Sequence, residues 1–120
     1  MSKRVLIVDD SKIVHTQMKK LLKDTEFEIV GCCQSGECAI QAYEEYKPDV
    51  VTMDIVMPGM DGLEATKEIL AKWPDAKIVI ASSLAHDDTI EEAGKIGTQG
   101  FVYKPFEKEE LLEALRNATK

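Results

Sequence analysis

Short apolar segments alternate with longer helix-patterned segments along the chain, and this alternation constrains the fold more than any other feature. Five apolar runs predict buried β-strands at residues 4–8, 27–31, 49–53, 77–81 and 101–103. Helical spacing or helix caps follow each run, at residues 11–24, 35–47, 63–72, 87–96 and 107–118. Five strand-then-helix units predict an α/β fold, a mostly parallel sheet with helices on both faces, because right-handed crossovers permit little else.

Length and charge limit the classes of function. The 120 residues predict one domain, covering 1–120, that buries a core without disulfides or a structural metal. Fifteen basic residues against 22 acidic ones give a net charge of −7, which argues against nonspecific binding to nucleic acid or to an anionic membrane. No apolar run is long enough for a signal peptide or a membrane span, so we expect a cytoplasmic protein without membrane insertion.

The cysteine and histidine residues do not form metal-binding motifs in the sequence. Cys32, Cys33 and Cys38 are odd in number and include an adjacent pair, which predicts buried, reduced thiols. His15 and His86 are expected at the surface, and neither lies in a kinase-like context.

Charged or hydroxyl-bearing residues follow four of the five predicted strands. They are Asp9 and Asp10 after the first strand, Asp54 after the third, Ser82 and Ser83 after the fourth, and Lys104 after the fifth. Ligands of such sheets bind beyond the carboxyl ends of the strands, near the point where strand order reverses. If the order is 2-1-3-4-5, the first and third strands are neighbours, and three carboxylates converge beside one lysine.

Three carboxylates in one cleft predict a divalent cation, because like charges are unfavourable there unless they are neutralised. Oxygen ligands with room for water and a phosphate suit Mg²⁺ better than Ca²⁺. Asp54 could then attack a phosphoryl group, while Lys104 pairs with a second oxygen and Ser82 donates to a third. Singly, each of these residues has an ordinary structural explanation, such as a helix cap or a solvated lysine; their agreement at four strand ends favours chemistry.

The motifs "LIVDDS", "DVVTMDIVMPGMDGLEA", "VIASS" and "GFVYKPF" occur in this order along the chain. With them, essentially the whole sequence resembles the receiver domain of two-component response regulators, and its single-domain length resembles the chemotaxis members of that family. The resemblance implies a flavodoxin-like, doubly wound, three-layer αβα fold with five helices and strand order 2-1-3-4-5.

The resemblance also implies roles for the residues at the strand ends. Asp54 would be the phosphorylation site, and Asp9, Asp10 and Asp54 would be the carboxylate ligands of Mg²⁺, for which Mn²⁺ could substitute. The backbone carbonyl of Val56 would be a further metal ligand. Lys104 would pair with the phosphate. The domain would promote its own phosphorylation and dephosphorylation, and it would not be a turnover enzyme.

A switch is implied by the same resemblance. The Ser82 hydroxyl would move to the phosphoryl group while the Phe101 ring turns inward, and the Lys104–Pro105 bond would be cis. Phe101 stands where many members have tyrosine, so a mechanism that relies on a phenolic hydroxyl is not open to this chain. Ser83 occupies a position often held by alanine.

Two apolar residues depart from the best-known members in the region of the attacking water. Val56 and Leu84 each lie two residues beyond an active-site residue, and neither side chain can hydrogen-bond a water molecule. We therefore expect slow intrinsic dephosphorylation, because hydrolysis needs an oriented water.

The resemblance implies an output surface on the fourth helix, fifth strand and fifth helix. The fourth helix contains Gly94, which weakens it by about 1 kcal/mol relative to alanine, so this helix is a candidate bistable element. Ile90 and Tyr103 are the candidate partner-binding residues there. Alternatively, Ile90 packs in the core and Tyr103 is an ordinary strand aromatic.

The implied partners are a sensor histidine kinase as phosphodonor, a downstream protein such as the flagellar motor switch, and a phosphatase; the protein is expected to be a monomer. A stand-alone phosphorelay intermediate, or a receiver cut from a DNA-binding regulator, would look similar; the end "LRNATK" favours a stand-alone protein only if it is the natural end. Two other classes of protein fit the sequence less well. An FMN carrier would need a hydroxyl- and glycine-rich loop after the first strand, and an aspartyl phosphatase would need a D-x-D arrangement there. This chain has the adjacent carboxylates Asp9 and Asp10 at that place.

Overall fold

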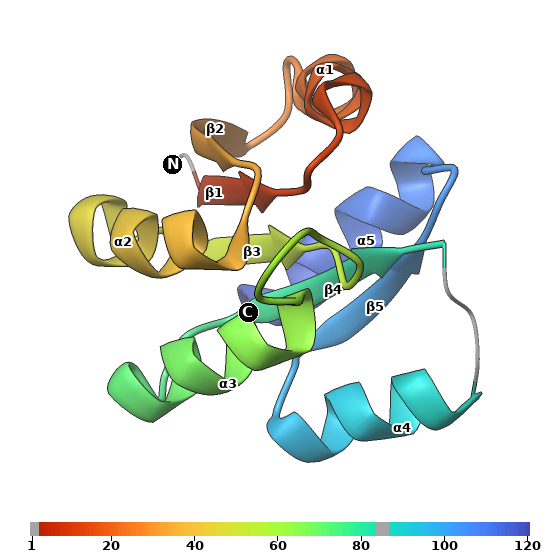
Figure 1. Cartoon of the computed structure of the whole chain (residues 1–120). Helices are drawn as coiled ribbons and strands as arrows, with labels where there is room; N and C mark the ends of the chain where they lie inside the picture. The colour runs from red at the N-terminus through yellow and green to blue at the C-terminus, as the bar shows by residue number, and fades with distance from the viewer. Residues whose placement is uncertain (1–2, 84–86) are drawn as a thin grey trace.

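The computed structural model describes residues 3–83 and 87–120, and these form a parallel sheet with helices on both faces (Figure 1). The described strands are β1 (Lys3–Val8), β2 (Phe27–Cys33), β3 (Val50–Met53), β4 (Ile78–Ser82) and β5 (Gly100–Tyr103). The described helices are α1 (Lys12–Leu22), α2 (Gly36–Tyr46), α3 (Gly62–Lys72), α4 (Asp87–Ile96) and α5 (Lys108–Ala118). The strand order is β2-β1-β3-β4-β5, which confirms the predicted flavodoxin-like topology.

Two apolar clusters, one on each face of the sheet, form the core. Helices α1 and α5 pack on one face, against strand residues such as Val5 and Val79. Helices α2, α3 and α4 cover the other face, against residues such as Leu6 and Ile80 (Figure 1). The central strands β1, β3 and β4 are buried on both faces, which explains why their sequences are continuous apolar runs rather than alternating ones.

Local capping sets the ends of the helices that follow β2 and β3. The Ser35 hydroxyl accepts a hydrogen bond from the Cys38 backbone N–H at 3.1 Å, as expected for the cap of α2. The Asp61 carboxylate accepts one from the Glu64 N–H at 2.9 Å and starts α3. Helix α2 ends at Tyr46, and its C-cap, Lys47, has a left-handed backbone directly before Pro48.

The cysteine prediction is wrong in part. Cys33 is buried, but Cys32 and Cys38 are exposed; all three are free thiols. Neighbouring residues of a strand project to opposite faces, and β2 is an edge strand that its helices cover incompletely, so Cys32 reaches solvent. Cys38 lies in the first turn of α2 and is exposed, whereas the adjacent Ala39 is buried.

Within the described part of the chain, every helix is too short or too polar to cross a lipid bilayer.

Candidate functional site

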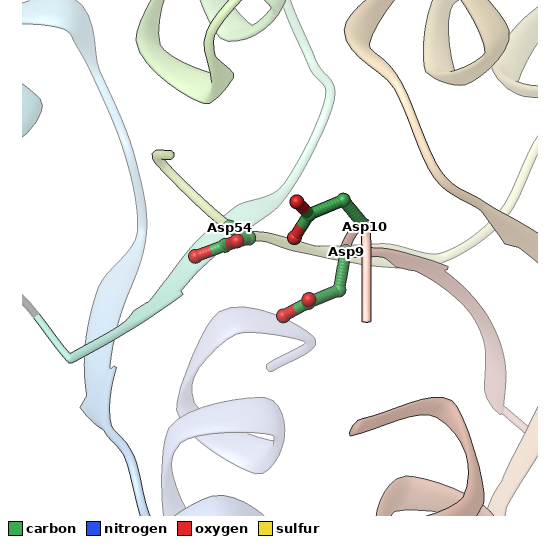
Figure 2. Close-up of side chains that lie close together, drawn as sticks. All are labelled: Asp9, Asp10 and Asp54. Atoms are coloured by element: carbon green, nitrogen blue, oxygen red, sulfur yellow. The ribbon is translucent and has the colours of Figure 1, made fainter. Parts of the chain in front are cut away.

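Three carboxylates meet at the carboxyl ends of β1 and β3. Asp9 and Asp10 directly follow β1, Asp54 directly follows β3, and one oxygen from each lies within 4.8 Å of the others. Figure 2 shows the three side chains close together, although more than 40 residues separate the two segments. Asp9 is 2% exposed and Asp54 is 4% exposed, while Asp10 is open to solvent. The structure therefore brings together the acidic residues that the sequence predicted.

Lys104 lies inside this cluster. Its Nζ is 2.6 Å from Asp9 Oδ2 and 3.3 Å from Asp54 Oδ1. Backbone hydrogen bonds place these residues relative to the sheet: the Asp54 N–H donates to the carbonyl of Val8 at 2.9 Å, and the Lys104 N–H donates to the carbonyl of Ser82 at 3.0 Å. The peptide bond between Lys104 and the residue that follows it is cis, as predicted.

The electrostatics of the site follow from burial and from three acidic groups around one base. Burial, and then the Asp9 carboxylate, raise the pKa of Asp54 to about 6, and the neighbouring Lys104 only partly opposes them. Burial lowers the pKa of Lys104, but its contacts with Asp9 and Asp54 outweigh that effect and raise it overall. Lys104 is therefore positively charged, and the three carboxylates around it leave an excess of negative charge that a divalent metal ion would neutralise.

The family model for the response regulator receiver domain matches residues 5–116. The chain belongs to the response regulator receiver family.

Individual relatives of this receiver domain agree with that assignment. The chain is 44% identical over 117 residues to the chemotaxis protein CheY of Listeria monocytogenes, covering 98% of each chain. It is 41% identical over 120 residues to CheY of Thermotoga maritima, covering both chains fully. Among solved structures, the CheX-CheY-BeF3-Mg complex of Borrelia burgdorferi matches with a TM-score of 0.94 at 28% identity, over 98% of this chain and 90% of that one.

The switch residues expected for a receiver lie on neighbouring strands. Ser82 is buried and is the last residue of β4, so it ends the strand rather than following it. Phe101 lies on β5 beside Ile80 of β4, is half-buried, and packs against the core cluster on the α3 and α4 face. Movement of the Ser82 hydroxyl and of the Phe101 ring stays a prediction.

Of the two residues expected near the attacking water, Val56 lies within the described part of the chain and Leu84 does not. Val56 lies in the loop after Asp54 and is 60% exposed, and its position beside the attacking water stays a prediction. Its backbone carbonyl as a metal ligand stays a prediction. Leu84 and His86 lie outside the described residues.

The expected partner surface is partly accessible. Tyr103 is 43% exposed, and its ring centroid is 5.1 Å from that of Phe101. Ile90, on α4, is half-buried. Gly94 is exposed, with room around it for a side chain. A role of these residues in binding a partner stays a prediction.

Sequence reasoning misplaced His15. It was expected at the surface, but it is 8% exposed, and its Nε2–H donates to the Asp9 carbonyl oxygen at 2.8 Å. Helix α1 packs on the sheet through Val14, His15, Met18 and Leu22. That spacing of one, three and four residues is the inward stripe of a helix, and it was the signal in the sequence that could have placed His15.

Gly62 is a second residue that sequence reasoning missed. It begins α3 where that helix passes the Asp54 backbone, and a Cβ on residue 62 would collide with the carbonyl oxygen of Asp54. Its N–H donates to the Ile55 carbonyl at 2.8 Å. A glycine directly before the predicted helix at 63–72 was the available signal in the sequence.

The raised pKa of Asp54 predicts a pH-dependent stability. Between 3.8, the ordinary aspartate value, and about 6, the folded chain holds a proton on Asp54 that the unfolded chain has released. The free energy of unfolding should therefore fall as the pH rises through this window, by up to about 3 kcal/mol from this group. Asp54→Asn does not titrate and should lack that part of the decline.

Urea denaturation of the wild type and Asp54→Asn, without divalent cations and between about pH 4 and 7, measures the difference. Parallel stability curves for the two proteins would show that Asp54 titrates normally in the folded chain.

Proposed function

We propose that this receiver domain accepts a phosphoryl group on Asp54, in a reaction that requires Mg²⁺, and that it acts as a phosphorylation-controlled switch in chemotaxis signalling. The main support for this proposal is the acidic cluster. Lys104 contacts both Asp9 and Asp54 there, and a third carboxylate, Asp10, is exposed to solvent. The names of the relatives, chemotaxis proteins CheY, support the choice of pathway.

The residues of the cluster suit the metal. Asp9, Asp10 and Asp54 offer carboxylate oxygens, the ligand type that Mg²⁺ prefers, and a single lysine leaves their negative charge in excess. The Val56 backbone carbonyl would add a further oxygen. When bound, Mg²⁺ would neutralise this charge and hold phosphoryl oxygens. The Borrelia relative, crystallised with BeF3 and Mg, supports the same assignment.

The chemistry on the protein side is a transfer to a carboxylate. An oxygen of Asp54 attacks the phosphorus of a phosphohistidine on a sensor kinase, the new O–P bond forms, and the N–P bond breaks with the electron pair returning to the imidazole. Lys104 pairs with a phosphoryl oxygen, and the Ser82 hydroxyl donates to another. Asp54 ends as an acyl phosphate, so the chain is a phosphoryl acceptor rather than a turnover enzyme.

The output is proposed on the face formed by α4, β5 and α5. Ser82 ends β4 next to β5, so a hydroxyl that moves toward the phosphoryl group would open space for the Phe101 ring. Tyr103 and Ile90 lie on the elements that would report this change to a downstream protein, such as the flagellar motor switch. The CheX complex of the Borrelia relative supports a further partner that acts on the phosphorylated form.

Intact mass after incubation with acetyl phosphate tests the proposal. The wild type should gain one phosphoryl group when Mg²⁺ is present and none when a chelator removes it. A folded protein that gains no mass in either condition would mean that this receiver binds its partners without phosphorylation.

Val56→Asn is expected to shorten the lifetime of the phosphorylated form. An exposed amide at the edge of the site could hydrogen-bond the attacking water, which valine cannot do. One net hydrogen bond is worth about 1 kcal/mol, so hydrolysis should be roughly fivefold to tenfold faster. The time course of phosphoryl loss after removal of acetyl phosphate measures this rate. Val56→Ala, which removes bulk without adding a polar group, is the control, and equal rates in Val56→Asn and Val56→Ala would exclude water positioning.

A further inference from the structure

Asp9 is held at every polar position that it offers. Its backbone N–H donates to the carbonyl of Cys33 at 2.9 Å, and its Oδ2 lies 2.6 Å from Lys104 Nζ. Its Oδ1 accepts a hydrogen bond from the Ser11 N–H at 2.9 Å. Its backbone carbonyl accepts one from the His15 Nε2–H at 2.8 Å. Contacts with β2, with the start of α1 and with the chain after β5 therefore fix this buried residue.

His15 reaches the Asp9 carbonyl from the buried face of α1. The helix packs on the sheet through Val14 and Met18, and the His15 side chain lies between them in the sequence and is buried as they are. A carbonyl oxygen can only accept, so the proton of this hydrogen bond belongs to Nε2 of the ring. Because a buried carbonyl without a donor is unfavourable, the hydrogen bond holds the ring and the Asp9 backbone in place together.

The Asp9 carbonyl belongs to the same peptide unit as the Asp10 N–H. This unit is planar, so a hydrogen bond to its oxygen limits how the unit can rotate and therefore how the Asp10 side chain leaves the backbone. Figure 2 shows the Asp9 and Asp10 side chains leaving the backbone in different directions, although both carboxylates lie near Asp54. The Gln34 Nε2 contact with the Asp10 carbonyl is longer, at 3.5 Å. His15 is thus the closer of these two side-chain restraints on the segment.

We propose that His15 is a positioning residue of the metal site. Through the Asp9 carbonyl it holds the peptide unit between Asp9 and Asp10, and this keeps the exposed Asp10 carboxylate beside those of Asp9 and Asp54. These carboxylates bind Mg²⁺ under the proposed function, on which this inference rests. The contact is with the backbone, so His15 acts through the peptide unit and not as a metal ligand.

The affinity for the cation is the property that this restraint affects. An exposed carboxylate that can reorient loses that freedom when it binds a metal ion, and the loss weakens binding. Asp10 is exposed, whereas Asp9 and Asp54 are buried, so Asp10 has the most freedom to lose. Groups that orient metal ligands typically change metal affinity by about tenfold or more. Loss of the His15 hydrogen bond should therefore weaken Mg²⁺ binding by about tenfold.

Isothermal titration calorimetry of the metal-free protein with Mg²⁺ tests the proposal on two variants of matched shape. His15→Gln places an amide donor near the position of the ring nitrogen, and His15→Met has a similar length without a donor. His15→Gln should bind Mg²⁺ as the wild type does, and His15→Met about tenfold more weakly. His15→Asn, whose amide is too short to reach the same oxygen, is a second variant that lacks the bond and should bind as weakly as His15→Met.

Thr16→Val is the control on the same helix. The Thr16 hydroxyl donates to the Lys12 carbonyl of α1 at 3.1 Å, so its removal takes away a polar group without touching the Asp9 backbone. The affinity for Mg²⁺ should stay at the wild-type value in this variant.

Two further measurements separate positioning from a loss of fold. Urea denaturation of each variant establishes that it is fully folded under the conditions of the titration, where stability alone does not alter affinity. In the metal-free protein, the amide resonance of Asp10 should shift in His15→Met and return toward the wild-type position in His15→Gln. That N–H shares its peptide unit with the Asp9 carbonyl, so it reports the restraint directly.

Equal affinities of folded His15→Met and the wild type, with Asp54 still phosphorylated in both, would overturn this proposal and leave the proposed function intact. Equal weakening in His15→Met and His15→Gln would do the same, because the shape of the ring rather than its donor would then matter. A wild type that binds no Mg²⁺ would overturn the proposed function and this proposal together.

Discussion

Asp54→Asn is expected to gain no phosphoryl group from acetyl phosphate under conditions in which the wild type gains one. The amide that replaces the carboxylate is a poor nucleophile, and it also removes one of the three acidic groups that would hold Mg²⁺. Burial of the residue, at 4% exposure, leaves little room for another side chain to reach the same position. Intact mass measures whether each protein carries the added phosphoryl group, which we expect on the wild type and not on Asp54→Asn.

Asp75→Asn is a matched control for that variant. Asp75 is an exposed carboxylate on the loop between α3 and β4, at the opposite ends of the strands from Asp54. It should be phosphorylated as the wild type is. A phosphoryl adduct on Asp54→Asn at the wild-type rate would place the acceptor elsewhere and would refute the assignment, whereas loss of the adduct in both variants would indicate a general fault of folding.

Gly62→Ala is expected to destabilise the chain by about 3 kcal/mol or more, although alanine is the better helix former. The added methyl group would meet the carbonyl carbon and oxygen of Asp54, and then the Cα of Ile55. These are backbone atoms next to β3, so they cannot rotate away as a side-chain end could. Relief requires a shift of α3 away from the strand, which would also disturb the position of Asp54. Urea denaturation measures the loss.

Gly94→Ala provides the matched control. It makes the same chemical change inside a helix, but a Cβ at this position meets nothing within 4 Å. Its effect should be the helix preference alone, an increase of about 1 kcal/mol. If Gly62→Ala were as stable as Gly94→Ala, the close approach of α3 to Asp54 would be incorrect.

The fold could be predicted from local patterns, with small errors at the ends of elements. Strand β2 extends two residues beyond the predicted 27–31, because its pairing with β1 continues to Cys33 past an irregularity in register. Strand β4 likewise extends to Ser82, because Ser82 pairs with Tyr103 of β5. Such extensions depend on the neighbouring strand, which a run of apolar residues does not reveal.

The site was predictable because its residues follow the ends of parallel strands, and the sheet places those ends along one edge. What could not be predicted is the environment of each group. Asp9 and Asp10 are adjacent in sequence, yet one is buried against Lys104 and the other is exposed. The hydrogen bond from the His15 ring to the Asp9 carbonyl is a further contact that no local pattern indicates.

Local patterns in the chain were enough to predict the succession of strands and helices and the residues at the strand ends, since apolar periodicity and caps operate within about one turn or one strand. Tertiary packing was needed to reveal that burial and Asp9 outweigh Lys104 at Asp54, and that Gly62 lies against the Asp54 backbone. Desolvation and contact depend on distances between atoms of different helices and strands, and these distances are set only when the helices have packed on the sheet.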